Sequence, residues 1–342
     1  MTKRDVVRDV FENRKPAYVP WSIGLNHEVA EALADYFGSA DVIEDKLQNH
    51  FAVLGHPVHG PMVRHEGDIA IDYFGVHWDQ SIDKDCGSHT GLLLPEPTLD
   101  GFTFPDPEGD LIYAGAEEIL EKQTDRWRVW HIGFSLFERA WSLRGMENLL
   151  ADFYEEPEFV HELLGKIADY QCKVITHAAG KLDLDCVFFG DDWGMQTGLM
   201  MGPKLWDEFI RPYATQMYQH THSHGLKVLI HSCGKVESLF EDIITAGVDC
   251  FNPFQPEVMD VHALLRQYRG RLSFHGGMST QKTLPFGTRE DVIRDTNALI
   301  ESGRDGNLVF SPAHVVDGDV PYQNVLTFIE VLQAQPGAPK GL

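Results

Sequence analysis

The chain has few basic residues for its length. Its 342 residues include 28 Lys and Arg against 52 Asp and Glu, which gives a formal net charge of −24. No run of Lys or Arg exceeds two residues. Nucleic acids and anionic membrane surfaces are bound through clusters of positive side chains, so neither is an expected partner. The composition instead suits a small-molecule substrate.

Long apolar runs and paired cysteines are also absent. No stretch approaches the roughly 18 to 20 apolar residues of a membrane span. The charged, amphipathic N-terminus has no apolar segment of the kind that a secretory signal needs. The five cysteines contain no close CxxC pair and do not resemble a disulfide framework. We therefore expect a protein of the reducing cytoplasm.

The order of apolar runs predicts an α/β fold. Short apolar runs alternate with segments of helical period, as in the βα units of a parallel sheet. Seven strands are expected, at residues 16–24, 127–137, 185–194, 225–234, 248–256, 272–279 and 307–314. For an eighth strand, AVLGHPV (52–58) and IAIDYFGV (69–76) compete. Eight strands in a chain of this length fit a single (β/α)8 barrel.

The remaining segments elaborate this one expected domain, residues 1–342. An N-terminal helix precedes the first strand, and residues 144–180 are long enough for two helices. Residues 75–115 are rich in Gly, Pro and Asp, which predicts an insertion of hairpins or loops over one rim. The last residues, 336–342, are expected to form a frayed tail.

Polar side chains close most of the expected strands. In (β/α)8 barrels, chemistry takes place at the rim where the strands end. The candidates there are Asp191, Asp192 and Trp193 after the fourth strand, His231 and Cys233 after the fifth, Asn252 and Gln255 after the sixth, His275 after the seventh and His314 after the eighth. The two aspartates are candidate catalytic residues or partners of a metal-bound His, with helix capping as the alternative. Trp193, Asn252, Gln255 and His275 are candidate substrate contacts.

His231 and Cys233 have the spacing of metal ligands. Two residues apart on an extended chain, their side chains point to the same face and can reach one metal ion. The alternative is that both simply pack in the core of a binding protein without catalytic activity. A third ligand from another strand would favour the metal, and His314 is the best-placed candidate, with His275 next. Three protein ligands leave an open position, as a catalytic zinc ion requires.

Several longer motifs spread over essentially the whole chain carry a family resemblance. They are VPW (19–21), GDDWGMQTGLMMGPKLWDEFIRPY (190–213), HGLKVLIHSCG (224–234), GVDCFNPFQPE (247–257), GGMSTQKTLPFGTREDV (276–292) and SPAHVVDGDVPYQNV (311–325). The sequence resembles the uroporphyrinogen decarboxylase superfamily. This resemblance independently implies a (β/α)8 barrel. It also implies one of two activities, because the superfamily includes cofactor-free porphyrinogen decarboxylases and zinc-dependent, cobamide-linked methyltransferases.

Two features of this sequence bear on the choice between these two branches of the superfamily. Uroporphyrinogen decarboxylases carry a basic RQAGR-type motif after the first strand, whereas residues 22–27 here read SIGLNH, without an arginine to hold a polycarboxylate. The HxC pair resembles the methyltransferase branch, in which His, Cys and a later Cys bind zinc. His231 and Cys233 match that motif, and the later Cys position is occupied by or close to His314.

The resemblance therefore implies zinc-dependent methyl transfer between a corrinoid, carried by a partner protein, and a small molecule. It also implies a homodimer. The alternative is a metal-assisted decarboxylase or lyase that acts on a small hydroxylated or carboxylated substrate without a corrinoid. This alternative is favoured by the second imidazole, because one thiolate and two imidazoles leave a formal charge of +1 on a zinc site. Such a site is a stronger Lewis acid.

Overall fold

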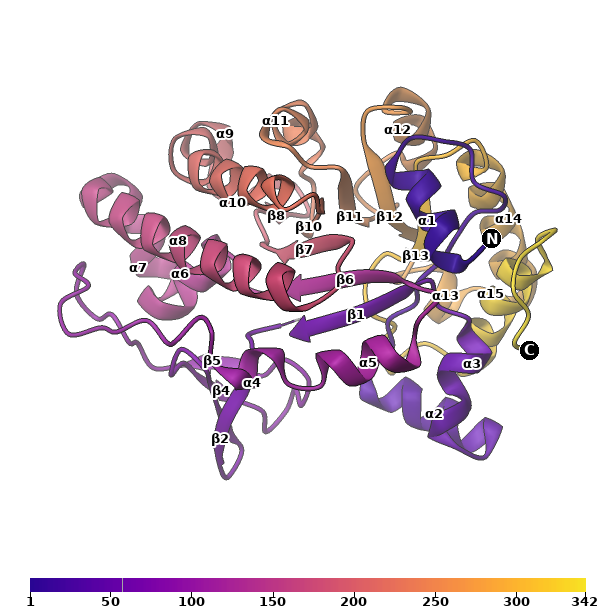
Figure 1. Ribbon diagram of the computed structural model, residues 1–342, viewed down its shortest axis with the longest axis horizontal. Helices are drawn as coiled ribbons and strands as arrows, with labels where there is room; N and C mark the ends of the chain where they lie inside the picture. The colour runs from indigo at the N-terminus through magenta and orange to yellow at the C-terminus, as the bar shows by residue number, and fades with distance from the viewer. Residues whose placement is uncertain (57) are drawn as a thin grey trace. The chain divides into compact units, whose positions relative to one another are not determined.

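The computed structural model describes residues 1–56 and 58–342 (Figure 1). These residues divide into two compact units. Unit 1 comprises residues 1–52, 123–127 and 249–342, and unit 2 comprises residues 53–122 and 128–248. The expectation of one domain over residues 1–342 stays a prediction. The parallel strands are ordered along one sheet as β1 (Phe51–His56), β6 (Trp127–Ile132), β7 (Cys186–Gly190), β10 (Lys227–His231), β11 (Cys250–Phe254), β12 (Ser273–Met278) and β13 (Leu308–Pro312).

In unit 2, β6, β7 and β10 pair in parallel. All five residues of β7 are buried, as expected of a strand with helices on one face and a core on the other. Between β6 and β7 the chain forms α6 (Phe137–Arg144), α7 (Met146–Glu155) and α8 (Pro157–Lys181). The prediction of two helices between residues 144 and 180 is thus confirmed. Between β7 and β10 lie α9 (Gly202–Leu205), a π-helical turn (Trp206–Ile210) and α10 (Arg211–Ser223), and β10 is followed by a short 3-10 turn and α11 (Phe240–Ala246).

Unit 2 also contains a separate antiparallel sheet. Its strands are β2 (Met62–Glu66), β3 (Ile69–Asp72), β4 (His77–Asp79) and β5 (Ser88–Thr90), and α4 (Asp110–Tyr113) and α5 (Ala116–Lys122) follow them. This settles the competition for the eighth strand. Phe51–His56 joins the parallel sheet, whereas Ile69–Asp72 is placed in the antiparallel sheet by glycine turns at Gly67 and Gly75, both with positive φ.

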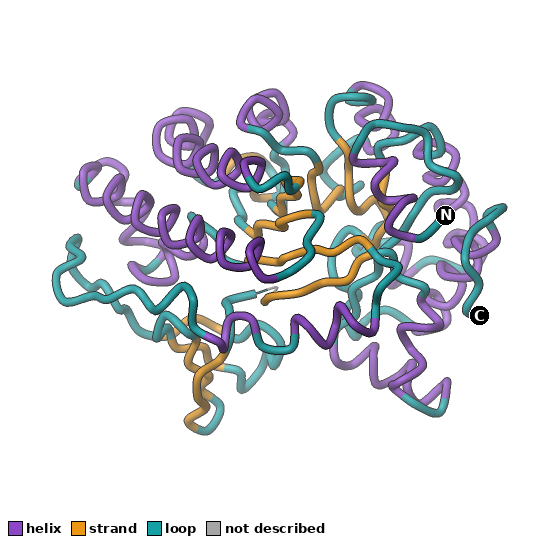
Figure 2. The backbone as a smooth tube through the Cα atoms, viewed as in Figure 1, coloured by secondary structure: helices purple, strands orange, loops and turns teal. Residues whose placement is uncertain are grey.

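In unit 1, β11, β12 and β13 pair in parallel. The helices α12 (Val261–Gln267), α13 (Thr283–Phe286), α14 (Arg289–Gly303) and α15 (Tyr322–Ala334) follow or separate these strands. The longest of them, α14, begins at a capping box formed by Thr288 and Asp291. Figure 2 shows the alternation of strand and helix along this part of the chain.

The expected first strand at 16–24 takes its place beside β13 but forms only isolated bridges. Trp21 pairs in parallel with Phe310, and Leu25 with Val316. Its other edge approaches the start of β1, because the backbone N–H of His50 donates to the carbonyl of Trp21 at 2.9 Å. Pro20 lacks the N–H that a continuous ladder needs, which is one reason that the pairing stays local.

The two ends of the chain are both attached to unit 1. The expected N-terminal helix is present as α1 (Lys3–Phe11), followed by α2 (His27–Phe37), a 3-10 turn (Ala40–Val42) and α3 (Ile43–Leu47). The expectation of a frayed tail is wrong. Gln333 Oε1 accepts hydrogen bonds from the backbone N–H groups of Gly341 and Leu342, and Lys46 Nζ donates to the carbonyl of Gly341. No described helix is long and apolar enough to cross a bilayer.

Candidate metal centre

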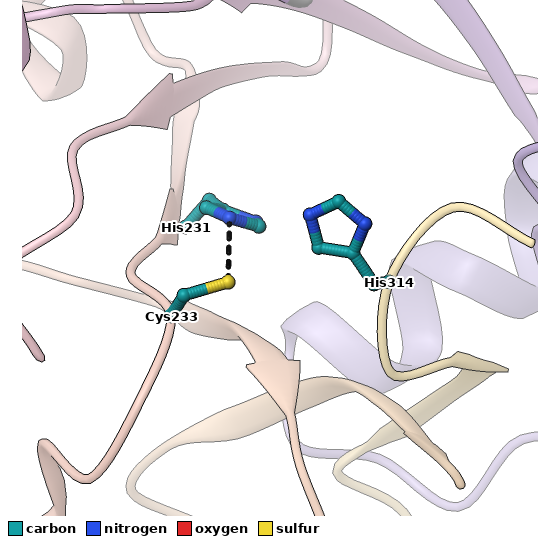
Figure 3. A group of neighbouring side chains, drawn as sticks. All are labelled: His231, Cys233 and His314. Carbon is teal, nitrogen blue, oxygen red and sulfur yellow. Dashed lines mark hydrogen bonds between the residues drawn. The ribbon is translucent and has the colours of Figure 1, made fainter. Parts of the chain in front are cut away.

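The end of β10 brings an imidazole and a thiol together. His231 is the last residue of the strand, and its Nε2 lies 3.4 Å from Sγ of Cys233 (Figure 3). Ser232, between them, points the other way and is fully buried, with its Oγ accepting a hydrogen bond from the Trp193 N–H at 2.9 Å. The alternation expected of an extended chain is therefore present, with both candidate ligand atoms on one side.

A short hairpin fixes the loop that carries Cys233. The hairpin consists of β8 (Gly194–Met195) and β9 (Gly198–Leu199), and the N–H of Lys235 donates to the carbonyl of Met195 at 2.8 Å. A Cβ atom on Gly194 would lie 2.4 Å from the carbonyl oxygen of Cys233. Glycine is thus required for the hairpin and the Cys233 loop to approach so closely.

The adjacent carboxylates Asp191 and Asp192 make different contacts. Asp192 Oδ1 accepts a hydrogen bond from the backbone N–H of Cys233 at 2.7 Å and lies 3.5 Å from His231 Nε2. Asp191 is buried, and its two oxygens accept from Trp193 Nε1 at 2.7 Å and from the N–H of Glu138 at 2.8 Å. Asp192 therefore borders the His–Cys pair, whereas Asp191 anchors Trp193 and the start of α6.

Burial and hydrogen bonding define the setting of Asp191 and Trp193. Burial raises the pKa of Asp191 to about 6, although the hydrogen bonds that it accepts oppose this shift. Trp193 is 1% exposed and packs its ring edge-on against Trp206, with centroids 5.5 Å apart. The indole of Trp193 is therefore buried and held in place, and its contact with a substrate stays a prediction.

Glu138, near the start of α6, is a carboxylate that the sequence reasoning missed. Burial raises the pKa of its carboxyl group well above the usual range, and the negative charges of Asp192 and Asp191 add to this. The residue directly follows the expected strand at 127–137. The rule used for the other strands, that polar side chains after a strand deserve inspection, would have found it.

The charges around Cys233 suit a cation. Burial raises the pKa of its thiol, and the nearby carboxylates Asp192 and Glu138 raise it further. A thiol in this setting stays protonated unless a positive charge arrives to stabilise the thiolate. A soft sulfur atom and an imidazole nitrogen are ligands that zinc prefers, so the donor chemistry fits this ion.

The other predicted site residues belong to unit 1. Asn252 and His275 are buried together, with Asn252 Nδ2 donating to the carbonyl of His275 at 2.9 Å. The ring of His275 packs against Phe51, with centroids 5.0 Å apart. Gln255 is buried, and its backbone carbonyl accepts a hydrogen bond from the backbone N–H of Met259. His314 is exposed and follows β13 in the chain. The expected contacts of these residues with substrate stay predictions.

The fold is that of enzymes whose parallel strands present chemistry at their carboxyl ends. Residues 114–335 match the family model described as "Uroporphyrinogen decarboxylase (URO-D)". The chain therefore belongs to the uroporphyrinogen decarboxylase family, a family of enzymes, and the resemblance seen in the sequence is confirmed.

Two curated relatives and one solved structure illustrate this relationship. The relatives are both named uroporphyrinogen decarboxylase. The one from Methylococcus capsulatus is 25% identical over 67% of this chain and 66% of its own length, and the one from Carboxydothermus hydrogenoformans is 25% identical over 52% and 49%. The chain thus spans between about half and two thirds of these relatives.

The solved structure is a methyltransferase from Methanosarcina mazei. It is 15% identical and covers 97% of this chain and 98% of its own, with a TM-score of 0.76. This likeness confirms the predicted α/β fold of the (β/α)8 barrel type.

Proposed function

We propose that the protein is a zinc-dependent methyltransferase that moves a methyl group between a corrinoid, carried by a partner protein, and a small molecule. The observation that carries the proposal is the convergence of His231 Nε2 and Cys233 Sγ at the end of β10. The name of the Methanosarcina mazei protein, methyltransferase, supports the same reaction class. A small-molecule substrate also suits a chain of charge −24 that lacks a basic patch.

His314 is the proposed third ligand. It follows β13 in the chain as Cys233 follows β10, so each of these residues stands at the carboxyl end of a parallel strand, which supports this choice. A set of one sulfur and two nitrogens leaves one position of a tetrahedral zinc site for the substrate. A zinc ion held there would lower the pKa of a bound thiol or hydroxyl group and so would favour the anion that accepts a methyl group.

Asp192 and Glu138 are proposed to act around the ligands rather than as ligands themselves. Asp192 holds the backbone of Cys233 in place, and its negative charge lies beside His231. This charge offsets the formal +1 of a zinc ion with one thiolate and two imidazoles. The site thereby regains the charge balance that a second thiolate would supply, which supports activation of a thiol. Asp191 is proposed to position Trp193, which together with Asn252, Gln255 and His275 is proposed to border the substrate.

A metal-assisted decarboxylase or lyase without a corrinoid is the second candidate. The names of the two curated relatives, both decarboxylases, favour this chemistry. The stretch SIGLNH at 22–27 argues against the porphyrinogen itself as the substrate, because it offers no arginine for the many carboxylates of that molecule. A smaller hydroxylated or carboxylated substrate is therefore the form of this alternative.

Metal analysis of the purified full-length chain tests the site. We expect about one zinc ion per chain, with a strong loss in Cys233→Ser and in His231→Gln. Cys172→Ser is the matched control for the thiol, because Cys172 lies on α8 outside the cluster. His314→Gln tests the third ligand separately. Zinc retained in full by Cys233→Ser and His231→Gln would refute the proposed centre.

The reaction is tested with the zinc-loaded chain, methylcobalamin and a panel of small thiols. Loss of the methylcobalamin absorption spectrum, dependent on both zinc and thiol, is the expected result. Cys233→Ser should abolish it, and Cys172→Ser should leave it unchanged. If the zinc-loaded protein leaves methylcobalamin intact with every thiol, the result would contradict methyl transfer and favour the decarboxylase or lyase.

A further inference from the structure

Helices α8 and α10 of unit 2 lie side by side and meet along a polar seam (Figure 1). Near the middle of the seam, Gln216 Nε2 donates to Asp169 Oδ1 at 2.9 Å. At the end of α10, two histidines approach a single hydroxyl group of α8. Nε2 of His220 lies 2.8 Å from Oγ1 of Thr176, and Nε2 of His224 lies 3.4 Å from the same oxygen. Two imidazole nitrogens thus converge on one point.

The spacing of the two histidines puts them on one face of the helix. His220 lies in the last turn of α10 and His224 is its C-cap, so they are four residues apart. Their ring centroids are 4.9 Å apart. His222, between them, points elsewhere, because a Cβ atom on Gly247 at the end of α11 would lie 3.3 Å from its Cε1. The pair at the seam is therefore His220 and His224.

The end of α10 holds both histidines in place. Thr221 is fully buried, and its hydroxyl donates to the carbonyl of Met217 at 2.9 Å. The backbone N–H of His224 donates to the carbonyl of Thr221 at 3.1 Å. A ligand that binds both imidazoles therefore has little backbone to order, which lowers the entropic cost of binding.

The pair is accessible to an ion from solution. Thr176 and His224 are exposed, and His220 is half-buried. The hydroxyl of Thr176 donates its one proton to the carbonyl of Cys172 at 3.0 Å, so each imidazole directs an Nε2–H group at its oxygen. When each ring carries its proton on Nδ1 instead, the two Nε2 lone pairs point to the same place, and a metal ion can bind there. In other helices, two histidines four residues apart bind one zinc ion from a single face.

This point is separate from the His–Cys pair. His224 precedes β10, whereas His231 is the last residue of that strand. The five residues of β10 span roughly 13 Å from first to last. The histidine pair therefore lies toward the amino end of the strand, where residues of this fold type contribute to stability rather than to chemistry.

We propose that His220 and His224 form a second metal site, which binds a divalent transition metal ion that prefers imidazole, of the class of Zn²⁺, Ni²⁺ and Cu²⁺. Water completes the coordination of the ion. The ion clamps the end of α10 just before β10 begins and so stabilises unit 2. The inference goes beyond the proposed function and does not depend on it, because the His231–Cys233 pair takes no part.

The test measures Ni²⁺ binding by titration calorimetry. The parent protein is the full-length chain with Cys233→Ser and His231→Gln, so that the candidate metal centre does not compete for the ion. We expect the parent to bind one Ni²⁺ ion, and a further His220→Gln or His224→Gln to weaken binding by at least about tenfold, because a single imidazole cannot chelate. His222→Gln is the matched control on the same helix end and should leave the affinity unchanged.

Thermal unfolding gives a second readout. The pair is assembled only in the folded helix, so Ni²⁺ should raise the Tm of the parent and of His222→Gln but not that of His220→Gln or His224→Gln. The inference is overturned if none of these three variants weakens Ni²⁺ binding, or if His222→Gln weakens it as much as His220→Gln does.

A crystal structure of the native chain with Ni²⁺ tests the site without any variant. The anomalous difference map should show the ion between the rings of His220 and His224, and Ni²⁺ found only elsewhere refutes the site. None of these measurements uses a corrinoid or a thiol, so their outcome is separate from that of the methyl-transfer assay.

Discussion

The buried histidine His50 predicts how the fold responds to acid. It is fully buried where the segment around Trp21 meets the start of β1 and of β6. Its backbone N–H donates to Trp21, its carbonyl accepts from the N–H of Trp127 at 2.8 Å, and its Nε2 lies 3.0 Å from the hydroxyl of Tyr18. Burial lowers the pKa of the imidazole from 6.5 to about 3, and the positive charge of Lys3 contributes.

The sign of the effect follows from proton binding in the two states. The unfolded chain protonates His50 near pH 6.5, whereas the folded chain does so only near pH 3. Between these values the unfolded state binds more protons, so the free energy of unfolding falls as the pH is lowered. Well inside this window each pH unit costs about 1.4 kcal/mol, and near its upper end less, so acidification from pH 7 to 4.5 should remove about 2.5 kcal/mol through His50 alone.

The assay compares urea unfolding of the native chain and of His50→Gln at pH 7 and pH 4.5. Glutamine keeps polar atoms at this position but does not titrate, so the variant should lose about 2.5 kcal/mol less than the native chain on acidification. Other titrating groups contribute equally to both proteins and cancel in the comparison. His65→Gln, on the exposed strand β2, is the control. An equal acid loss in the native chain and in His50→Gln would refute the reasoning.

Two further substitutions test close contacts inside unit 2, one beside Cys233 and one at the buried Arg139–Asp72 ion pair. Gly194→Ala places a Cβ 2.4 Å from the Cys233 carbonyl oxygen, so we expect weaker zinc retention and a loss of about 1 to 3 kcal/mol in the free energy of unfolding. Gly180→Ala is the control and should be neutral or stabilising, because its Cβ meets nothing within 4 Å. Equal zinc retention in the two variants would contradict this account. Arg139→Ala leaves the buried Asp72 carboxylate without its cation and should cost about 3 to 5 kcal/mol, measured by urea unfolding, and a loss below about 1 kcal/mol would show that the pair is not buried as described.

Much of the fold could be predicted because most strands of the parallel sheet are short apolar runs that end in polar residues or glycine. The segments at 185–194, 225–234 and 272–279 are buried apolar runs that finish in polar residues or glycine, and each contains a strand of the parallel sheet. The region from 50 to 80 was ambiguous for a physical reason. Both of its apolar runs have strand composition, and only long-range pairing places one in the parallel sheet and the other in a hairpin.

The end of the chain shows the same limit. Its Gly and Pro content is typical of a loose tail, but the side-chain amide of Gln333 accepts from two of its N–H groups. The strength of such a contact depends on which side chain is present in a neighbouring helix. Local composition cannot report this.

The sequence predicts features of the candidate site that depend on local spacing, but not those that depend on tertiary contacts. The spacing of His231 and Cys233 gives their common orientation directly, because side chains two apart on an extended chain share a face. The difference between Asp191 and Asp192 has no such local signature. It arises because one carboxylate meets Trp193 and α6 while the other meets the Cys233 loop.

Glu138 links these observations to the charge of the molecule. The net charge of −24 first served only to disfavour polyanionic partners, but its distribution near Cys233 is more informative. Two carboxylates act on the thiol in the same direction, and in a buried setting that arrangement opposes a thiolate. A divalent cation reverses the balance, since the carboxylates then lower the energy of the cation while the cation stabilises the thiolate. The acidic surroundings that make Cys233 a poor nucleophile alone thus make it a suitable ligand, which favours a metal centre over a free cysteine nucleophile.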